Sequence, residues 1–162
     1  GLYEVELGVP LRHIVEDLGG GLRTGGLAGV IVGGPLAGVV PPALLDVPFT
    51  FEDLHAIGCA LGHGGVVGFD ERTTIAELVH HVFAFGAYES CGKCTPCRVG
   101  GAEAETIFAE VLAGRANGSR RSFESIVAAL HATSLCGHGS GLAEFALGVA
   151  RHFPEELDSC FG

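Results

Sequence analysis

The feature that most constrains the fold of this chain is a run of three cysteines in the stretch ESCGKCTPCRVG, residues 89–100. Cys91, Cys94 and Cys97 form a C-x2-C-x2-C pattern, and Cys136 follows later in TSLCGHG. Cysteines this closely spaced are poorly placed for independent disulfides and well placed for a shared metal. The pattern therefore predicts a metal site on one tight loop, with a further ligand from a distant segment.

The three-plus-one arrangement of the cysteines favours a cubane [4Fe-4S] cluster. Such a cluster needs one thiolate per iron, and a tight loop reaches three corners of the cube while Cys136 meets the fourth. Zinc instead usually draws its ligands as two C-x2-C pairs or as a mixture of cysteine and histidine. Zinc with His138 as an alternative ligand, and structural thiols without any metal, stay open as alternatives at this point.

Residues inside the cysteine loop suit a backbone that wraps a cluster. Gly92 and Pro96 help the loop to turn, so that its N–H groups can face the sulfurs and tune the reduction potential. A helix after Cys97 is expected to point its positive end at the site. Lys93 and Arg98 add positive charge there, or are ordinary solvated charges.

Composition excludes several other functions. Nine Lys plus Arg against nineteen Asp plus Glu give a formal charge of -10, so nucleic-acid binding, which needs a basic face, is not expected. The uncharged stretch from Thr24 to Leu45 is interrupted by glycines and prolines, which argues against a membrane span. Six cysteines are too few for a secreted disulfide scaffold, and no basic leader precedes an apolar region, so the cytoplasm is the predicted compartment. The lack of methionine favours a segment of a longer chain.

The first part of the chain has the pattern of a small α+β unit. Residues 1–8, GLYEVELG, alternate apolar and polar side chains as a half-buried strand does. A helix is expected from Pro10 to Gly19, and a buried strand at residues 28–34. The sequence T50-F-E-D53 predicts a helix start, and residues 64–70 predict a closing strand. The glycines between these elements are interpreted mainly as turn formers.

The remainder reads as helical. T74-I-A-E77 is a capping box that opens the first helix, and apolar residues recur at helical spacing in residues 101–112, 123–131 and 141–153. Residues 114–121, GRANGSRR, are the expected connection before the third helix. Four short helices can form a small bundle. The predicted domains are residues 1–72 and 73–162.

The two cysteine motifs carry a family resemblance. ESCGKCTPCRVG resembles the tetranuclear-cluster motif of the flavin-bearing, NADH-oxidising subunit of respiratory complex I. It is also similar to the matching subunits of NAD-dependent formate dehydrogenases and NAD-linked hydrogenases. SLCGHGSG followed by RHFPEEL resembles the segment of that family that carries the fourth cysteine and the helix after it.

The resemblance implies a fold and a function. It implies a ubiquitin-like β-grasp domain followed by a helical domain with one [4Fe-4S] cluster held by Cys91, Cys94, Cys97 and Cys136. The cluster is then a metal-binding relay for single electrons between a flavin and further iron–sulfur centres, in a flavoprotein complex with other subunits. Electron transport of this kind needs no catalytic acid, base or nucleophile in these residues. A zinc-stabilised interaction module is the alternative function.

Departures from the family pattern limit what the resemblance implies. The family binds FMN and NAD(H) through a loop of the GRGGAGFPTG kind, and neither GGLAGVIVGG nor GHGGVVGF has its arginine and glycine order. The oxidoreductase site is therefore expected in an upstream domain or a partner chain. His138 stands where relatives commonly have an apolar residue; it is expected to bond a cluster sulfur, to make the potential pH-sensitive or only to fill space. Cys59 and Cys160 are interpreted as non-ligands, Cys59 as a small buried residue and Cys160 as a thiol of the tail. Glu89 and Ser90 are expected to end a helix or to support the site by hydrogen bonding, not to catalyse.

Overall fold

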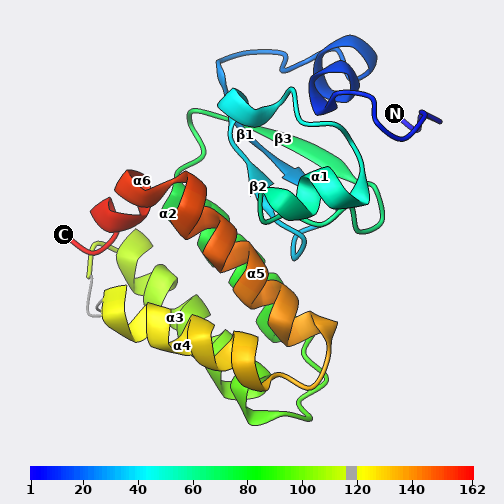
Figure 1. Cartoon of the computed structure of the whole chain (residues 1–162). Helices are drawn as coiled ribbons and strands as arrows, with labels where there is room; N and C mark the ends of the chain where they lie inside the picture. The colour runs from blue at the N-terminus through cyan, green and yellow to red at the C-terminus, as the bar shows by residue number, and fades with distance from the viewer. Residues whose placement is uncertain (116–119) are drawn as a thin grey trace. The chain divides into compact units, whose positions relative to one another are not determined.

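The computed structural model describes residues 1–115 and 120–162. The predicted connection at residues 114–121 therefore lies partly outside the described residues. The chain forms two compact units, Gly1–Thr73 and Thr74–Gly162, and each is described by itself. The first combines a small antiparallel sheet with short helices, and the second is helical throughout its regular elements (Figure 1).

The sheet of the N-terminal unit has three strands in the order β2-β1-β3. The strands are β1 (Leu27–Val32), β2 (Val39–Val40) and β3 (Val66–Asp70), and both pairings are antiparallel, with Val30 opposite Val40 and Gly68. β1 and β3 match strands expected from the sequence, whereas β2 is too short to show a period. The central strand β1 is buried at Val30 and Val32 because β-branched side chains pack well on a pleated surface.

Short helical segments cover this sheet and complete its core. They are η1 (His13–Leu18), a π-helical segment, then η2 (Pro42–Leu44) and α1 (Phe51–Ala56). α1 begins where the sequence predicts, because the Thr50 side chain accepts a hydrogen bond from the Asp53 N–H at 3.0 Å. The core of this unit contains Leu11, Val30, Val32, Val40, Leu45, Phe49, Leu54 and Cys59.

The strand predicted at residues 1–8 does not form. Leu2 is 99% exposed and Leu7 is 65% exposed, and this segment joins the rest of the unit only near its end. There the Gly8 N–H donates to the Phe49 carbonyl at 3.2 Å, and the isolated bridge that follows pairs Pro10 with Pro48. Proline has no N–H with which to extend a β-ladder, so the pairing of Pro10 with Pro48 stays a single bridge. Residues 1–8 therefore have the alternating pattern of a strand but no partner strand.

The C-terminal unit is built from six helical elements among the described residues. They are α2 (Ile75–Tyr88), the π-helical η3 (Pro96–Gly100), α3 (Gly101–Leu112), α4 (Arg120–Thr133), α5 (Gly137–His152) and α6 (Pro154–Ser159). The capping box predicted at Thr74 and Glu77 is present at the start of α2. α5 begins before its predicted start because Gly137 and Gly139 are helical here. α6 starts anew at Pro154, whose ring fits a first helical turn.

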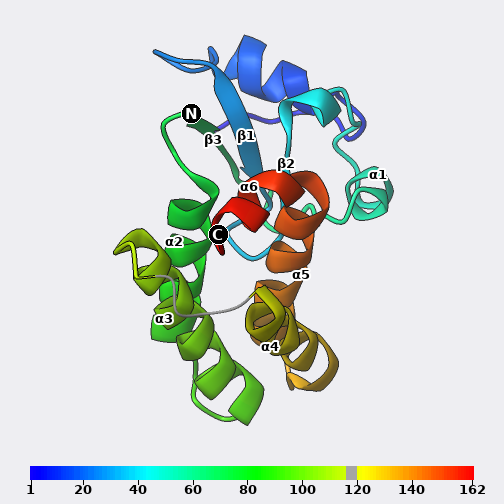
Figure 2. The same ribbon diagram turned by 90° about the vertical axis from the view of Figure 1, so that its left-hand side faces the viewer.

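The helices of this unit pack in pairs around aromatic side chains. α2 lies along α3, and α4 lies along α5 (Figures 1 and 2). Phe83 of α2 and Phe108 of α3 both contact the ring of Phe123 on α4 edge to face, with centroid separations of 5.8 and 5.0 Å. Such pairs add specific geometry to the burial of large apolar surfaces, and they fix the three helices around one centre.

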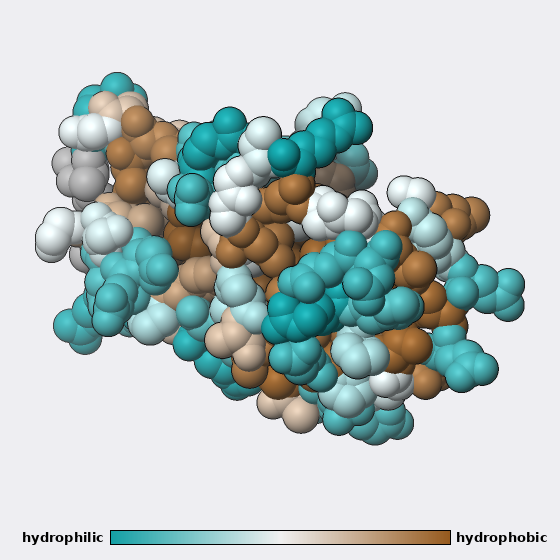
Figure 3. Space-filling view, turned by 90° about the horizontal axis from the view of Figure 1, so that it is seen from above, coloured by the Kyte–Doolittle hydropathy of each residue, from teal (hydrophilic) through white to brown (hydrophobic). Residues whose placement is uncertain are grey.

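None of the helices described here has the length and apolar character needed to cross a bilayer. On the face shown in Figure 3, apolar residues reach the surface in several separate patches with polar residues between them.

Candidate metal centre

The cysteine loop lies between the end of α2 and the start of η3. Glu89 caps α2, with its N–H donating to the Phe85 carbonyl at 2.9 Å, so the prediction that this position ends a helix is confirmed. Gly92 then takes a φ of +73°, a conformation that other residues rarely adopt. Pro96 starts η3. The loop thus reverses the chain within a few residues, as a tight ligand loop requires.

The three loop cysteines differ in exposure. Cys91 is exposed, Cys94 is half-buried and Cys97 is buried at 5% exposure. Cys97 belongs to the first turn of η3, which packs against α3, α4 and α5. One side of the loop is therefore fixed by the bundle, and the other side is open.

Cys136 comes from the opposite segment and lies at the N-cap of α5, with extended backbone. The residue before it contacts the loop directly, because the Leu135 N–H donates a hydrogen bond to the Cys94 sulfur. This bond, and a second one from the Cys97 N–H, lower the pKa of the Cys94 thiol from its ordinary value. The fold thus brings the segment of the fourth cysteine to the loop, and it favours a thiolate there.

Further hydrogen bonds brace the loop. The hydroxyl of Ser90 lies 3.3 Å from the Cys97 sulfur and also accepts from the Gly92 N–H at 3.3 Å. Arg98 donates from Nη1 to the Gly92 carbonyl at 3.0 Å. Ser90 therefore supports a cysteine by hydrogen bonding, as expected, while Arg98 holds the turn at Gly92 as well as carrying charge.

His138 has a role that sequence reasoning did not name. Its Nε2 lies 2.8 Å from the carbonyl oxygen of Gly86 on α2, and a carbonyl only accepts, so this nitrogen is the donor. A larger residue at Gly86 would clash with α5, because a Cβ there would lie 2.5 Å from Leu142 Cδ2. His138 thus joins the start of α5 to α2 across a close helix contact.

The residues around Cys97 form a cradle that suits a bound group. Ser134 Oγ is buried without a hydrogen-bond partner. A Cβ on Gly139 would collide with that oxygen and lie 3.2 Å from Cys97 Cβ. Within residues 1–115 and 120–162, no three His, Cys, Asp or Glu side chains converge as a ready metal site. The donor set of four thiols and an unused hydroxyl nevertheless fits the chemistry of an iron–sulfur cluster, with Cys91, Cys94, Cys97 and Cys136 as its holders.

The two other cysteines serve elsewhere. Cys59 is buried in the N-terminal core at 4% exposure, and its thiol faces the Val39 carbonyl at 3.5 Å. Cys160 follows α6, where its thiol lies 3.2 Å from the Glu156 carbonyl and burial raises its pKa. The expectation that Cys59 is a small buried residue is confirmed.

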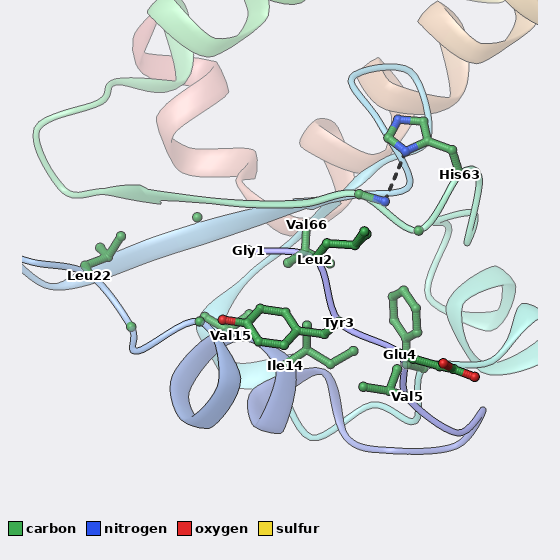
Figure 4. A pocket seen from close by; sticks show the side chains of 16 residues that line it. Gly1, Leu2, Tyr3, Glu4, Val5, Ile14, Val15, Leu22, His63 and Val66 are labelled. Carbon is green, nitrogen blue, oxygen red and sulfur yellow. Dashed lines mark hydrogen bonds between the residues drawn. The ribbon is translucent and has the colours of Figure 1, made fainter.

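The glycine-rich segments of the N-terminal unit line a separate cavity of about 770 Å³. Figure 4 shows His63 at its edge, where Nδ1 accepts from the Gly65 N–H at 3.1 Å. The Gly33 N–H donates to the Gly65 carbonyl at 2.7 Å, and the His63 N–H donates to the Gly33 carbonyl at 3.3 Å. These amides bond to groups of the same unit, one within a turn and two between neighbouring loops, which supports a structural role for the glycines.

A helical unit with this cysteine loop, which follows a small α+β unit in the sequence, defines an iron–sulfur-binding class of chain. The chain belongs to the family described as "NADH-ubiquinone oxidoreductase-F iron-sulfur binding region", whose model matches residues 77–160. The match contains both cysteine motifs, so the family predicted from them is confirmed.

Two relatives are similar to this chain over nearly its whole length. The F 2 subunit of NADH-quinone oxidoreductase from Rhizobium meliloti is 35% identical over 159 residues, which cover 97% of this chain and 38% of that protein. The HndC subunit of the NADP-reducing hydrogenase from Solidesulfovibrio fructosivorans is 32% identical over 163 residues, covering 98% and 33%. The chain thus spans about a third to two fifths of the length of these two curated relatives.

A solved structure has the same fold. The crystal structure of an NAD+-reducing [NiFe]-hydrogenase in the H2-reduced state aligns over 100% of this chain and 27% of that one, with a TM-score of 0.82 and 30% identity.

Proposed function

We propose that this chain holds one [4Fe-4S] cluster through Cys91, Cys94, Cys97 and Cys136 and relays single electrons within an NAD-linked oxidoreductase. The observation that carries the proposal is the close approach of the segment around Cys136 to the cysteine loop: η3 packs against α5, and a Cβ on Gly139 would lie 3.2 Å from Cys97 Cβ. The Leu135 N–H also lowers the pKa of the Cys94 thiol, so the fourth cysteine's segment meets a loop that already carries three. When bound, such a cluster supplies one-electron transfer.

The chain's own residues prepare and shield the site. Backbone N–H groups of Leu135 and Cys97 favour the thiolate form of Cys94, which is the form that binds iron. The Ser90 hydroxyl, 3.3 Å from the Cys97 sulfur, adds a polar contact of the kind that tunes a potential. No acid, base or nucleophile is assigned, because passing an electron requires none.

The finer fold assignment belongs to the same proposal. Residues 1–72 are a ubiquitin-like β-grasp domain, and residues 73–162 are a four-helix bundle that binds the cluster. The antiparallel sheet β2-β1-β3 with its short helices supports the first assignment. The packing of α2 with α3 and of α4 with α5 supports the second.

The larger assembly is inferred from the relatives. Their names include NADH-quinone oxidoreductase and NADP-reducing hydrogenase subunits, and this chain matches 38% and 33% of those two proteins. FMN and NAD(H) are therefore assigned to residues outside this chain or to a partner, and further iron–sulfur centres to other subunits. A cytoplasmic location, free or at the face of a membrane complex, goes with this role.

Iron and acid-labile sulfide analysis tests the proposal. The full-length protein that carries this chain is purified anaerobically, together with its Cys94→Ala and Cys160→Ala variants. We expect four fewer irons and four fewer sulfides per chain after Cys94→Ala, as [4Fe-4S] stoichiometry requires, and no loss after Cys160→Ala. One zinc per chain at this site, without sulfide, would replace the electron-transfer role by the zinc-stabilised interaction module. An unchanged metal content after Cys94→Ala would exclude both.

A further inference from the structure

One hydroxyl next to the cysteine loop has no partner. Ser134 Oγ is the only side-chain oxygen or nitrogen atom in the described part of the chain that is fully buried and makes no hydrogen bond. Burying such a group without a partner costs free energy, so native proteins keep one only for a reason. Ser134 lies two residues before Cys136, directly after the end of α4, where the turn that leads into α5 begins.

Ser134 does not make the hydrogen bond that serine and threonine hydroxyls usually make near a helix. Three other hydroxyls in α4 and α5 donate to the carbonyl four residues earlier. Ser125 bonds Arg121, Thr133 bonds Ala129, and Ser140 bonds Cys136. The Ser134 backbone N–H donates to the Leu130 carbonyl, four residues earlier, at 3.2 Å, but the Ser134 hydroxyl makes no bond to that carbonyl.

The surroundings direct this hydroxyl to the cysteine site. The position that a Cβ of Gly139 would occupy lies 2.8 Å from Ser134 Cβ and 3.2 Å from Cys97 Cβ, so both residues border it. Gly139 is buried in the first turn of α5. Any larger residue there would push Ser134 and Cys97 apart, so the glycine keeps hydroxyl and cysteine close.

We propose that Ser134 is a positioning residue whose O–H donates a hydrogen bond to a sulfur of the cluster at Cys97. This inference rests on the proposed function and deepens it. The Ser90 hydroxyl already lies 3.3 Å from the Cys97 sulfur. The Ser134 hydroxyl, in contrast, gains its partner only when the cluster binds. A donor at sulfur favours the reduced, more negative state and raises the reduction potential.

The test compares Ser134→Ala with Ser125→Ala in the full-length protein, purified anaerobically with its cluster. Ser125 is the matched control because its hydroxyl makes an ordinary bond within α4. An EPR-monitored redox titration should show that Ser134→Ala lowers the equilibrium constant for reduction about three- to tenfold, the size of one neutral hydrogen bond. That is a shift of about 30 to 60 mV at 59 mV per tenfold for one electron. Ser125→Ala should leave the potential unchanged.

A spectroscopic reading separates a bond to sulfur from a packing effect. Proton ENDOR of the reduced cluster, recorded in H2O and D2O, should show one exchangeable coupling fewer in Ser134→Ala than in the parent and in Ser125→Ala. An unchanged potential with all exchangeable couplings retained would overturn the inference while leaving the cluster in place. Absence of iron and sulfide from the parent protein would instead overturn the proposed function, so the two failures are distinguishable.

Discussion

Two loop regions of this molecule look alike in the sequence, both rich in residues that turn the chain, but they use their backbone amides differently. In the glycine-rich loops of the N-terminal unit, amides such as Gly33 N–H are bonded to carbonyls of the same unit. At the cysteine loop, the N–H groups of Cys97 within the loop and of Leu135 in the segment before α5 are directed at the Cys94 sulfur. The first region is closed on itself, and the second faces a ligand.

The difference teaches that turn-forming residues alone do not identify a binding site. What separates the two regions is where their polar groups point. A loop that satisfies its amides internally serves the fold, whereas a loop that directs them at nucleophilic atoms and leaves a hydroxyl unpaired is prepared for a bound group.

The strongest test of this comparison removes a ligand from the second region. Cys94→Ser should weaken cluster binding more than about 100-fold, because even changes to residues behind metal ligands cost about 10- to 100-fold. Iron content and the visible absorption of the anaerobically purified full-length protein measure the effect. Cys59→Ala, in the other unit, should retain full iron. Equal iron loss in both variants would remove the distinction between the two regions.

A substitution in the first region should affect stability without affecting iron. Gly33 has a φ of +78°, and a Cβ there would lie 2.8 Å from both Ala37 Cβ and the Leu61 carbonyl oxygen. Gly33→Ala should therefore lower the free energy of unfolding by about 2 to 4 kcal/mol, from backbone strain plus overpacking.

Gly64→Ala is the matched control for that experiment. Gly64 has the same φ of +78°, but no atom lies within 4 Å of the place that an added methyl would take, so only the strain of about 1 kcal/mol is expected. Urea unfolding, followed by circular dichroism, measures both variants. Equal costs for the two would show that the close packing at Gly33 contributes nothing.

At the cysteine site, Gly139→Ala should have a smaller but more specific effect. The added methyl would collide with Ser134 and press on Cys97, at a cost of about 1 to 3 kcal/mol, and the cluster should be lost faster on exposure to air. Gly137→Ala is the control in the same helix, because nothing lies within 4 Å of its added methyl. A Gly139→Ala protein as air-stable as Gly137→Ala would argue against the cradle.

The smallest expected effect is that of Ser90→Ala. This change removes the contact of 3.3 Å with the Cys97 sulfur and should cost about 1 kcal/mol, the usual net value of one hydrogen bond. Thermal unfolding of the cluster-free chain measures it, with Ser159→Ala as the control, because the Ser159 hydroxyl bonds a helix carbonyl. A cost no larger than that of the control would mean that this contact adds no stability.

Local rules explain the parts of the fold that the sequence predicts well. Thr50 and Thr74 open helices because a side-chain oxygen caps a nearby N–H, and this signal needs only four residues. β1 and β3 have the β-branched composition of strands. Residues 1–8 carry an equally clear alternation, but a strand also needs a partner, and that information is not local. α5 starts earlier than expected although glycine has poor helix propensity, and Gly139 in its first turn is buried against Ser134 and Cys97, a contact that the local sequence does not show.

The same division holds at the candidate site. The four cysteines are visible from spacing because cluster ligands must be cysteines at close intervals. Ser134 gave no such signal, because its interest lies in a hydrogen bond that is not made. His138 stood out in the sequence, but its partner, the Gly86 carbonyl, is far away along the chain and was not predicted. A glycine facing a serine and a cysteine across a turn is recognisable only once the helices are packed.

The positions of Cys97 and Cys136 have one more consequence. Cys97 lies at the start of η3, and Cys136 lies immediately before α5, so these two residues bracket α3 and α4. A cluster that joins them closes this helical hairpin into a ring of about 40 residues, which in the chain-entropy model of a covalent cross-link stabilises the native state by about 4 kcal/mol. Binding of the cluster would then cross-link these helices, so that assembly of the metal site and stabilisation of the helical unit occur together.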